Sequence, residues 1–253
     1  MKKLFFFLII STIYLSQSLY PNLSKTHPNI NKYKLIVGLY NEVNFDRANE
    51  YITCMAYNYA HELIDEIHVI YDTSKDDGEN KLLTYLKSLD LKISYINNRP
   101  TYGYCFELAN KLYPHCRIIL SNADIYFNET LKLLDDYDLT NKFLALTRWN
   151  VLNDGSIKLY FAPDGKKSEF SQDTWIFKTP LKQIIGDKIY MGIPGCDGKI
   201  VRQANLSGLG VSNPCLSIQC CHLHLTDIRN YSKIIDFSMS DLMKVPWEEL
   251  NQK

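Results

Sequence analysis

The stretch Arg117-Ile118-Ile119-Leu120-Ser121-Asn122-Ala123-Asp124-Ile125-Tyr126-Phe127 decides how the rest of the chain is interpreted. One basic residue precedes three large aliphatic residues, and the run then changes to small polar residues and one acid. This pattern is typical of a strand that is buried on both faces and ends at the carboxyl edge of a sheet. Open α/β sheets bind ligands at that edge, so Asp124 is well placed to meet a substrate or a metal ion. The alternative is a turn in which Asn122 and Asp124 cap a following helix.

Three earlier segments have the same form, an apolar run that ends in polar or acidic residues. Four strands that alternate with three helices predict βαβ units and a mostly parallel sheet. Right-handed crossovers would bring the four carboxyl ends to one edge of this sheet. The earlier strands are predicted at 34–39, 67–72 and 92–96, and the helices after a cap at Asp46, at 82–89 and at about 104–112.

The pattern changes after Phe127, where the elements become shorter and the turns richer in Gly and Asp. We find no internal repeat and no low-complexity linker, so we expect residues 33–232 to form one domain that a C-terminal tail at 233–253 follows. The further elements are a short helix at 130–137, strands at 142–147 and 173–177, a helix at about 198–206 and a late strand at 219–225.

The composition indicates a soluble globular protein. The 253-residue chain has a formal net charge of zero, with 46% hydrophobic and 22% charged residues. A neutral chain without a long run of Lys and Arg is not expected to have a nucleic acid as its partner. The seven cysteines are odd in number and Cys220 and Cys221 are adjacent, so at least one thiol stays free or pairs between chains.

The N-terminus has the form of a signal peptide. Lys2 and Lys3 precede an apolar run from Leu4 to Leu15, and small residues follow. We expect a signal peptide at 1–18, with an uncleaved signal anchor as the alternative, and then a polar lead-in at 19–32. This segment predicts a signal-directed protein that either stays in the lumen of the secretory pathway or is secreted. The protein would be anchored in a membrane only if the segment stays uncleaved.

From Lys34 to about Tyr231, the order of elements resembles the GT-A fold of the nucleotide-sugar glycosyltransferase superfamily. The closest local match comprises Gly103, Ala109-Asn110-Lys111 and 118–124, and it resembles the helix and strand that precede the Asp-x-Asp metal motif of that superfamily. Asn122 stands where the motif has its first acid. The resemblance implies a Rossmann-like α/β fold: a mixed, mostly parallel central sheet flanked by helices. Residues 33–127 would form the nucleotide-binding half and 128–232 the acceptor half.

A sugar-nucleotide donor leaves as a diphosphate, whose developing charge needs a cation or basic residues. Asp124 offers a hard oxygen ligand for Mn²⁺ or Mg²⁺. His222 and His224 are two apart on a predicted strand and therefore point to one face. The resemblance implies that one of them completes the metal site, and the alternative is that either is simply packed or exposed. Arg229 is a candidate to face the diphosphate.

The other predicted site residues divide by role. The resemblance implies that Asp197 is the general base, with Asp173 as second choice, while a helix N-cap is the alternative for Asp197. Trp149 and Trp175 are candidates to stack on an acceptor sugar, and burial is the alternative. Loop or capping roles are the alternatives for the donor-binding candidates, which are Leu39, Tyr40, Asn41, Glu42, Asp72, Arg99, Asn110, Asn122, Ala123 and Asp124.

These observations predict a glycosyltransferase that uses a divalent cation, Mn²⁺ or Mg²⁺. It would move a sugar from a nucleotide-sugar donor to a hydroxyl of a glycan, a glycoprotein or a lipid. One alternative is a sugar nucleotidyltransferase, but residues 39–42 lack the Gly-rich phosphate loop that such enzymes carry near the first strand. A second alternative is a non-catalytic carbohydrate-binding protein on a degenerate GT-A fold, which the replacement of an acid by Asn122 keeps open.

Overall fold

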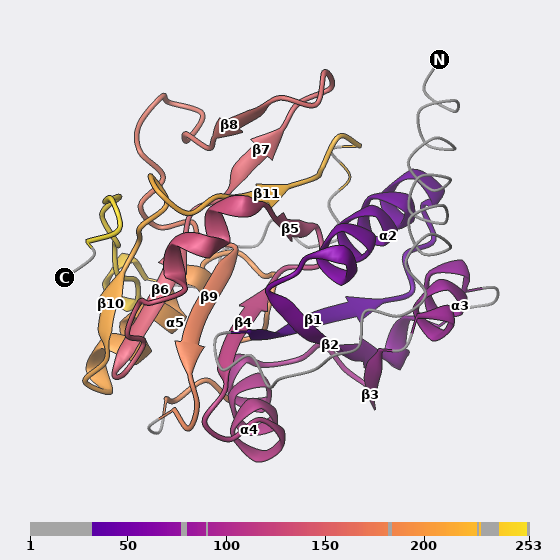
Figure 1. Cartoon of the computed structure of the whole chain (residues 1–253), viewed down its shortest axis with the longest axis horizontal. Helices are drawn as coiled ribbons and strands as arrows, with labels where there is room; N and C mark the ends of the chain where they lie inside the picture. The colour runs from indigo at the N-terminus through magenta and orange to yellow at the C-terminus, as the bar shows by residue number, and fades with distance from the viewer. Residues whose placement is uncertain are drawn as a thin grey trace. The chain divides into compact units, whose positions relative to one another are not determined.

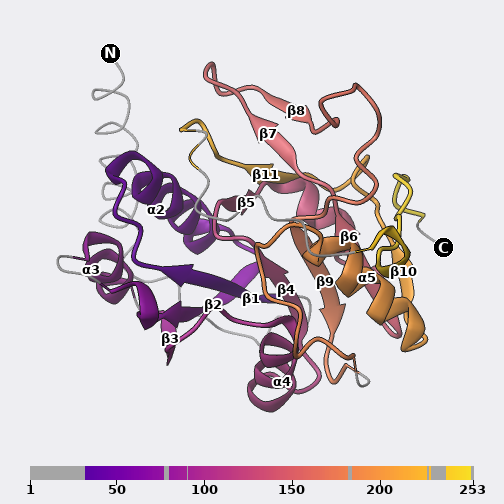
Figure 2. The same ribbon diagram turned by 180° about the vertical axis from the view of Figure 1, so that it is seen from behind.

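The computed structural model describes residues 32–76, 80–89, 91–181, 184–226, 228 and 238–251, so the predicted signal peptide and Arg229 lie outside the described residues. The helices and strands are arranged around two sheets (Figures 1 and 2). The helices are α2 (Phe45–Ala60), α3 (Lys81–Ser88), α4 (Tyr102–Leu112) and α5 (Cys196–Leu206), with 3₁₀ helices η1 (Thr73–Lys75), η2 (Glu129–Leu134) and η3 (Met239–Asp241).

The larger sheet has seven strands in the order β10-β6-β9-β4-β1-β2-β3. Its neighbours pair in parallel except β9, which is antiparallel to both β4 and β6. The predicted fold, a mixed and mostly parallel sheet flanked by helices, is therefore confirmed. These strands are β1 (Tyr33–Tyr40), β2 (Ile64–Asp72), β3 (Lys92–Ile96), β4 (Arg117–Ser121), β6 (Lys142–Leu146), β9 (Thr174–Lys178) and β10 (Gly210–Ser212).

A smaller sheet lies beyond the carboxyl end of β4 (Figure 1). Its strand order is β5-β11-β7-β8, and β11 pairs antiparallel with β5 and parallel with β7. Because β5 follows β4 after a three-residue turn, this sheet brings the histidine-bearing strand β11 next to Asp124. Its strands are β5 (Ile125–Phe127), β7 (Trp149–Val151), β8 (Ile157–Leu159) and β11 (Cys220–His222).

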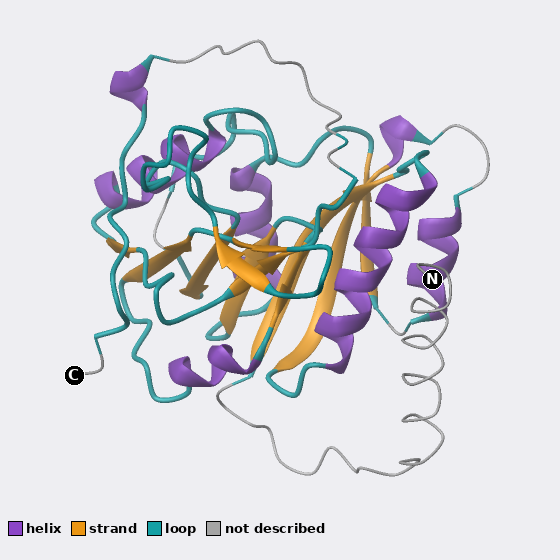
Figure 3. Ribbon diagram, turned by 90° about the horizontal axis from the view of Figure 1, so that it is seen from above, coloured by secondary structure: helices purple, strands orange, loops and turns teal. Residues whose placement is uncertain are grey.

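Helices cover both faces of the larger sheet (Figure 3). Side chains alternate along β1, so Leu35 and Val37 join one buried cluster with residues of α2 and α3. Ile36 belongs to a second buried cluster with residues of α4 and α5. Both faces of the sheet are therefore shielded from water. For this reason the strands have continuous apolar runs in the sequence instead of alternating apolar and polar residues.

Two predicted helix starts differ in the structure. Asn44, not Asp46, caps α2, and its side-chain oxygen accepts a 2.9 Å hydrogen bond from the Arg47 backbone N–H. Asp46 lies in the first turn, where a negative charge is favourable to the helix dipole. The helix expected at 130–137 is the 3₁₀ helix η2, which Asn128 caps. This six-residue helix, about two 3₁₀ turns, packs through the buried Leu131 and Leu134.

The turn after β4 does not cap a helix, because residues Ile125–Phe127 continue as strand β5. The late strand is also shorter than predicted, since it ends at His222 and leaves His224 beyond it. Residues 238–251, which the sequence places in a tail, contribute the buried Val245 and Trp247. Within the described residues, no helix is long and apolar enough to span a bilayer.

Candidate active site

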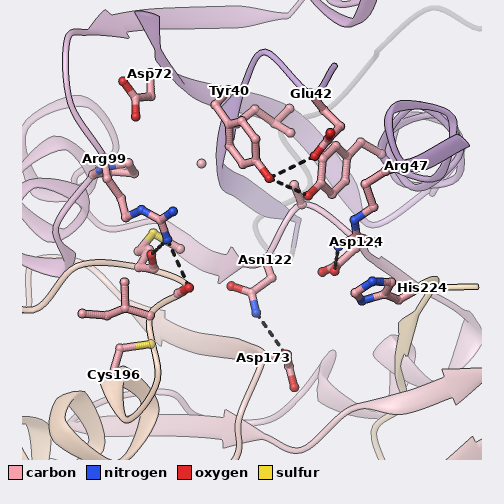
Figure 4. A pocket seen from close by; sticks show the side chains of 18 of the residues that line it. Tyr40, Glu42, Arg47, Asp72, Arg99, Asn122, Asp124, Asp173, Cys196 and His224 are labelled. Carbon is pink, nitrogen blue, oxygen red and sulfur yellow. Dashed lines mark hydrogen bonds and ion pairs between the residues drawn. The ribbon is translucent and has the colours of Figure 1, made fainter. Parts of the chain in front are cut away.

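One pocket of about 600 Å³ lies at the carboxyl edge of β1, β2 and β4. The loop before α5 and the segment after β11 complete its wall (Figure 4). Of the predicted site residues that the structure describes, all but three line this pocket. Those that line it are Leu39, Tyr40, Asn41, Glu42, Asp72, Arg99, Asn122, Ala123, Asp124, Asp173, Asp197, His222 and His224.

Asp124, His222 and His224 form a cluster in which one potential ligand atom from each lies within 4.8 Å of the others. Asp124 and His222 are buried, and His224 is partly buried. A carboxylate with two imidazoles is a donor set that suits Mn²⁺ better than Mg²⁺, because Mg²⁺ prefers oxygen ligands. The cluster is therefore a candidate metal site.

The hydrogen bonds of the two histidines leave one ring nitrogen of each for a cation. His224 Nε2 lies 2.9 Å from the Ile228 carbonyl, to which only a protonated nitrogen can donate, so its Nδ1 keeps the lone pair. Burial, followed by the nearby charge of Arg47, lowers the pKa of His224 to about 4 and keeps this ring neutral at pH 7.

His222 is oriented in the same way by Asn150. His222 Nδ1 lies 3.2 Å from Asn150 Oδ1, which also accepts from Arg148 Nε and is thereby identified as the oxygen. Nδ1 therefore donates, and Nε2 points at Asp124 Oδ2 from 3.1 Å. Two acceptor atoms at this distance need a proton or a metal ion between them.

Arg47 supplies a fixed positive charge in this corner. Its Nη2 lies 2.5 Å from Asp124 Oδ2, and its Nη1 donates to Glu50 Oε2 at 2.7 Å. Burial acts to raise the pKa of Asp124, but His222 and Arg47 outweigh it and hold that pKa well below its usual range. Glu50 in turn accepts from the backbone N–H groups of Leu225 and Thr226 at 2.7 and 2.8 Å. The pair therefore joins α2 to the segment that carries His224.

A second polar cluster surrounds Asp173 on the other side of the pocket. Asn122 Nδ2 donates to Asp173 Oδ1 at 3.0 Å, and Arg148 Nη1 donates to Asp173 Oδ2 at 3.1 Å. Asp173 is 6% exposed and Arg148 is 9% exposed, so this ion pair is shielded from water. Two donors therefore hold the Asp173 carboxylate in a fixed position.

Asp197 lies in the first turn of α5, which begins after Gly195. Gly195 has φ of 81°, in the left-handed region that favours glycine, and it makes no side-chain cap. The cap role considered for Asp197 is thus absent, because position 195 is the N-cap. Burial, followed by the negative charge of Asp173, raises the pKa of Asp197 to about 7. A carboxyl group with this pKa can exchange a proton at neutral pH.

The strand tips supply polar groups of a different kind. Asn41 is buried, and its Nδ2 is a donor without a hydrogen-bond partner in the described part of the chain. Asp72 caps η1 by accepting from the Ser74 N–H at 2.9 Å, which realises the capping alternative. Arg99 Nη1 donates to the carbonyls of Met191 and Gly192, both at 3.1 Å, and so holds the loop before α5.

Three of the predicted site residues that the structure describes lie outside the pocket. Asn110 exchanges hydrogen bonds with the backbone of Leu181, at 2.8 and 3.2 Å, so it anchors the chain after β9. Trp175 is fully buried between β4 and β6 and packs edge-on against Tyr102, so its ring cannot stack on a sugar. Trp149 is partly buried, and its Nε1 donates to the Cys215 carbonyl at 2.9 Å.

Sequence reasoning missed Arg47, Glu50 and Arg148. Arg47 did offer a signal, because a basic residue in the first turn of a helix is opposed by the helix dipole and needs a compensating partner. Arg148 follows the end of β6, as Asp124 follows β4, and the rule that polar residues gather beyond strand ends covers it too. Glu50 gave no such signal in its helix.

Comparisons with known proteins support the fold. No protein-family model and no curated protein sequence matches the chain. Among solved structures, the mannosyltransferase PcManGT from Pyrobaculum calidifontis, in complex with GDP-Man and Mn²⁺, has a TM-score of 0.51 at 13% identity over 88% of this chain and 66% of that one. TarS 1-349 from S. aureus has a TM-score of 0.44 at 20% identity, over 78% and 58%.

The likeness to the mannosyltransferase confirms the predicted class of fold: the chain has the GT-A fold that nucleotide-sugar glycosyltransferases use. The chain spans less than two thirds of the length of either structure. At such identities the likeness concerns the fold, and any activity must be argued from the pocket itself.

Proposed function

We propose that this chain is a glycosyltransferase that moves a sugar from a nucleoside-diphosphate donor to a hydroxyl acceptor with the help of a divalent cation. The observation that carries the proposal is the convergence of Asp124, His222 and His224 within 4.8 Å, in the same pocket as Asp197. Ligands for a cation and a carboxyl group with a pKa of about 7 are the two parts that such a transfer requires.

The residues present fit a divalent cation. The neutral His224 keeps a lone pair on Nδ1, His222 directs Nε2 toward Asp124, and Asp124 remains ionised. We propose that these three residues hold Mn²⁺, which accepts imidazole more readily than Mg²⁺ does. Bound there, the cation would neutralise the charge that develops on the departing diphosphate.

We assign the donor to the strand tips. The unpaired amide nitrogen of Asn41 and the carboxylate of Asp72 offer a donor and an acceptor to the ribose or the base. Arg47, Lys75 and Arg99 line the same pocket and contribute positive charge toward the diphosphate. The buried Arg47 is fixed by its two carboxylate partners, so its charge costs no reorganisation during the reaction.

Asp197 is the proposed general base. It removes the proton of the acceptor hydroxyl while that oxygen bonds to the anomeric carbon, and the bond from this carbon to the diphosphate oxygen breaks. The electron pair of the broken bond leaves with the nucleoside diphosphate, and the configuration at the anomeric carbon inverts. Burial and the negative charge of Asp173, which pairs with Arg148, raise the pKa of Asp197 and keep it basic enough for this task.

The acceptor and the location of the protein belong to the same proposal. We propose a hydroxyl of a glycan, a glycoprotein or a lipid as acceptor and a hexose as the transferred sugar. The signal-directed location rests on the sequence pattern at 1–18, which lies outside the described residues. Sugar nucleotides are present in the lumen of the secretory pathway, so this location is compatible with the proposed reaction.

A panel of labelled sugar nucleotides, incubated with the protein and Mn²⁺, tests the proposal. We expect transfer or donor hydrolysis with one nucleotide class, and loss of activity on addition of EDTA. Asp197→Asn should lower the transfer rate at least about 100-fold while donor affinity is kept. Asp154→Asn, in an exposed turn, is the matched control and should retain full activity. Equal transfer by wild type and Asp197→Asn would remove Asp197 as the base.

The same panel, together with a parallel assay that supplies a nucleoside triphosphate and a sugar phosphate, separates the alternatives. A non-catalytic carbohydrate-binding protein would neither hydrolyse nor transfer from any donor, and its Asp124→Ala variant would bind glycans as the wild type does. A sugar nucleotidyltransferase would release pyrophosphate from a nucleoside triphosphate and a sugar phosphate. Either result would contradict the proposed transfer.

A further inference from the structure

The antiparallel strand β9 places residue 173 directly opposite residue 122. The β4–β9 ladder ends with the pair Ser121 and Thr174. One residue further on, the Asn122 backbone N–H donates to the Asp173 carbonyl at 3.0 Å. The side chains repeat the contact, with Asn122 Nδ2 donating to Asp173 Oδ1 at 3.0 Å (Figure 4). Asn122 and Asp173 are therefore cross-strand neighbours, joined through both backbone and side chains.

The charges around this pair exclude another acid. Asp173 has one cation, Arg148, at 3.1 Å, and Asp197 is close enough for its proton affinity to be affected by Asp173. Asp173 is thus a buried carboxylate with one ion-pair partner, Arg148, and a second acid, Asp197, nearby. An aspartate at position 122 would set a like charge opposite Asp173 and remove the N–H that Asp173 accepts from.

We propose that Asn122 is a positioning residue for Asp173, and that the first position of the Asp-x-Asp-like segment serves the acceptor side of the pocket instead of the cation. Its amide fixes Asp173 Oδ1, while Arg148 fixes Oδ2. Asp124 is held by different partners, Arg47 and His222, whereas the side chain of Asn122 donates to Asp173. The assignment of Asp173 to the acceptor side rests on the proposed function, but the contacts themselves do not.

The test compares Asn122→Asp, Asp173→Asn and the exchanged double variant Asn122→Asp/Asp173→Asn. The double variant keeps one acid and one amide across the strands and the same total charge. Asn153→Asp, in the exposed turn after β7, is the matched control for adding an acid. Asn122→Ala removes the hydrogen bond without adding charge, and it serves if Asn122→Asp does not fold. The readouts are the melting temperature at about pH 7.5 and the Mn²⁺ affinity from the electron paramagnetic resonance of free Mn²⁺.

We expect Asn122→Asp to lower the melting temperature by about 5 °C. The double variant should recover more than half of this loss, because one amide again donates to one carboxylate. Asn153→Asp should change neither readout. The Mn²⁺ affinity of Asn122→Asp and of Asn122→Ala should stay within about twofold of the wild type.

An increase in Mn²⁺ affinity of about tenfold or more in Asn122→Asp, with no loss of stability, would overturn the inference, since position 122 would then belong to the cation site. The inference would also be overturned if the loss of stability in the double variant equals or exceeds the sum of the losses in the two single variants. Where transfer is measurable, Asn122→Ala should lower kcat about tenfold and leave the donor KM unchanged. Stability and Mn²⁺ affinity need no turnover, so they test Asn122 even if the chain is not a transferase.

Discussion

Arg47 is the residue whose removal should expose the electrostatics of the pocket most directly. It is 5% exposed, bridges Glu50 and Asp124, and lies over the ring of Tyr51 at 4.5 Å. Arg47→Met keeps an unbranched side chain of similar reach in the helix but removes the charge. Two buried carboxylates then lose their shared cation.

The size of the effect follows from the remaining partners. Removing one member of a buried ion pair costs about 3–5 kcal/mol, because the other member is left charged and unpaired. Asp124 keeps its contact with His222, and Glu50 keeps the N–H groups of Leu225 and Thr226. We therefore expect the lower end, about 3 kcal/mol, which corresponds to a melting temperature lower by roughly 6–12 °C for a domain of this size.

Urea unfolding and thermal melts with and without Mn²⁺ measure this change. Mn²⁺ should raise the melting temperature of Arg47→Met more than that of the wild type, because a cation on Asp124 replaces part of the lost charge. Lys132→Met, which breaks the exposed pair with Glu62, is the control and should have no measurable effect. If Arg47→Met costs no more than Lys132→Met, the reasoning about a buried charge network is refuted.

Two further predictions concern the base and the metal ligands. The transfer rate should fall as the pH is lowered through about 7, because Asp197 becomes protonated. Asp173→Asn should move this acid limb of the pH profile to lower pH, because a negative charge that helps to raise the pKa of Asp197 is gone. Transfer rates measured over about pH 5 to 9 test this, and an acid limb at the same pH in both proteins would contradict it. Asn150→Ala should weaken Mn²⁺ binding about tenfold in a titration, because Asn150 orients His222, whereas Asn153→Ala should not; equal affinities would show that the contact is dispensable.

The long strands of the sheet could be predicted from sequence because both faces of the sheet are covered. All five residues of β4 are buried, and its three aliphatic residues form the continuous apolar run from which the strand was predicted. Strands of three residues, such as β7 and β8, offer too few positions for any period to appear. The position of β9 was also beyond the sequence, because its insertion between β4 and β6 is a tertiary choice.

The location of the site could be predicted from the parallel arrangement of the first four strands. Residues that follow parallel strands share an edge, so Asn41, Asp72 and Asp124 were expected to meet, and all three line one pocket. What the sequence could not show is which polar groups pair across the pocket. The partner of Asn122 became visible only with the antiparallel register of β9, and the burial of Trp175 has the same cause.

The cysteines carry a practical consequence. All seven are free thiols, and six of them are buried, with only Cys116 partly exposed. Burial raises the pKa of Cys215 and Cys221 to about 12, so these thiols stay protonated and unreactive while the chain is folded. Alkylation of each cysteine, followed by mass spectrometry, would therefore report how often its surroundings open. Cys196 beside Asp197 and Cys221 beside His222 would report separately on the two sides of the pocket, without any added label.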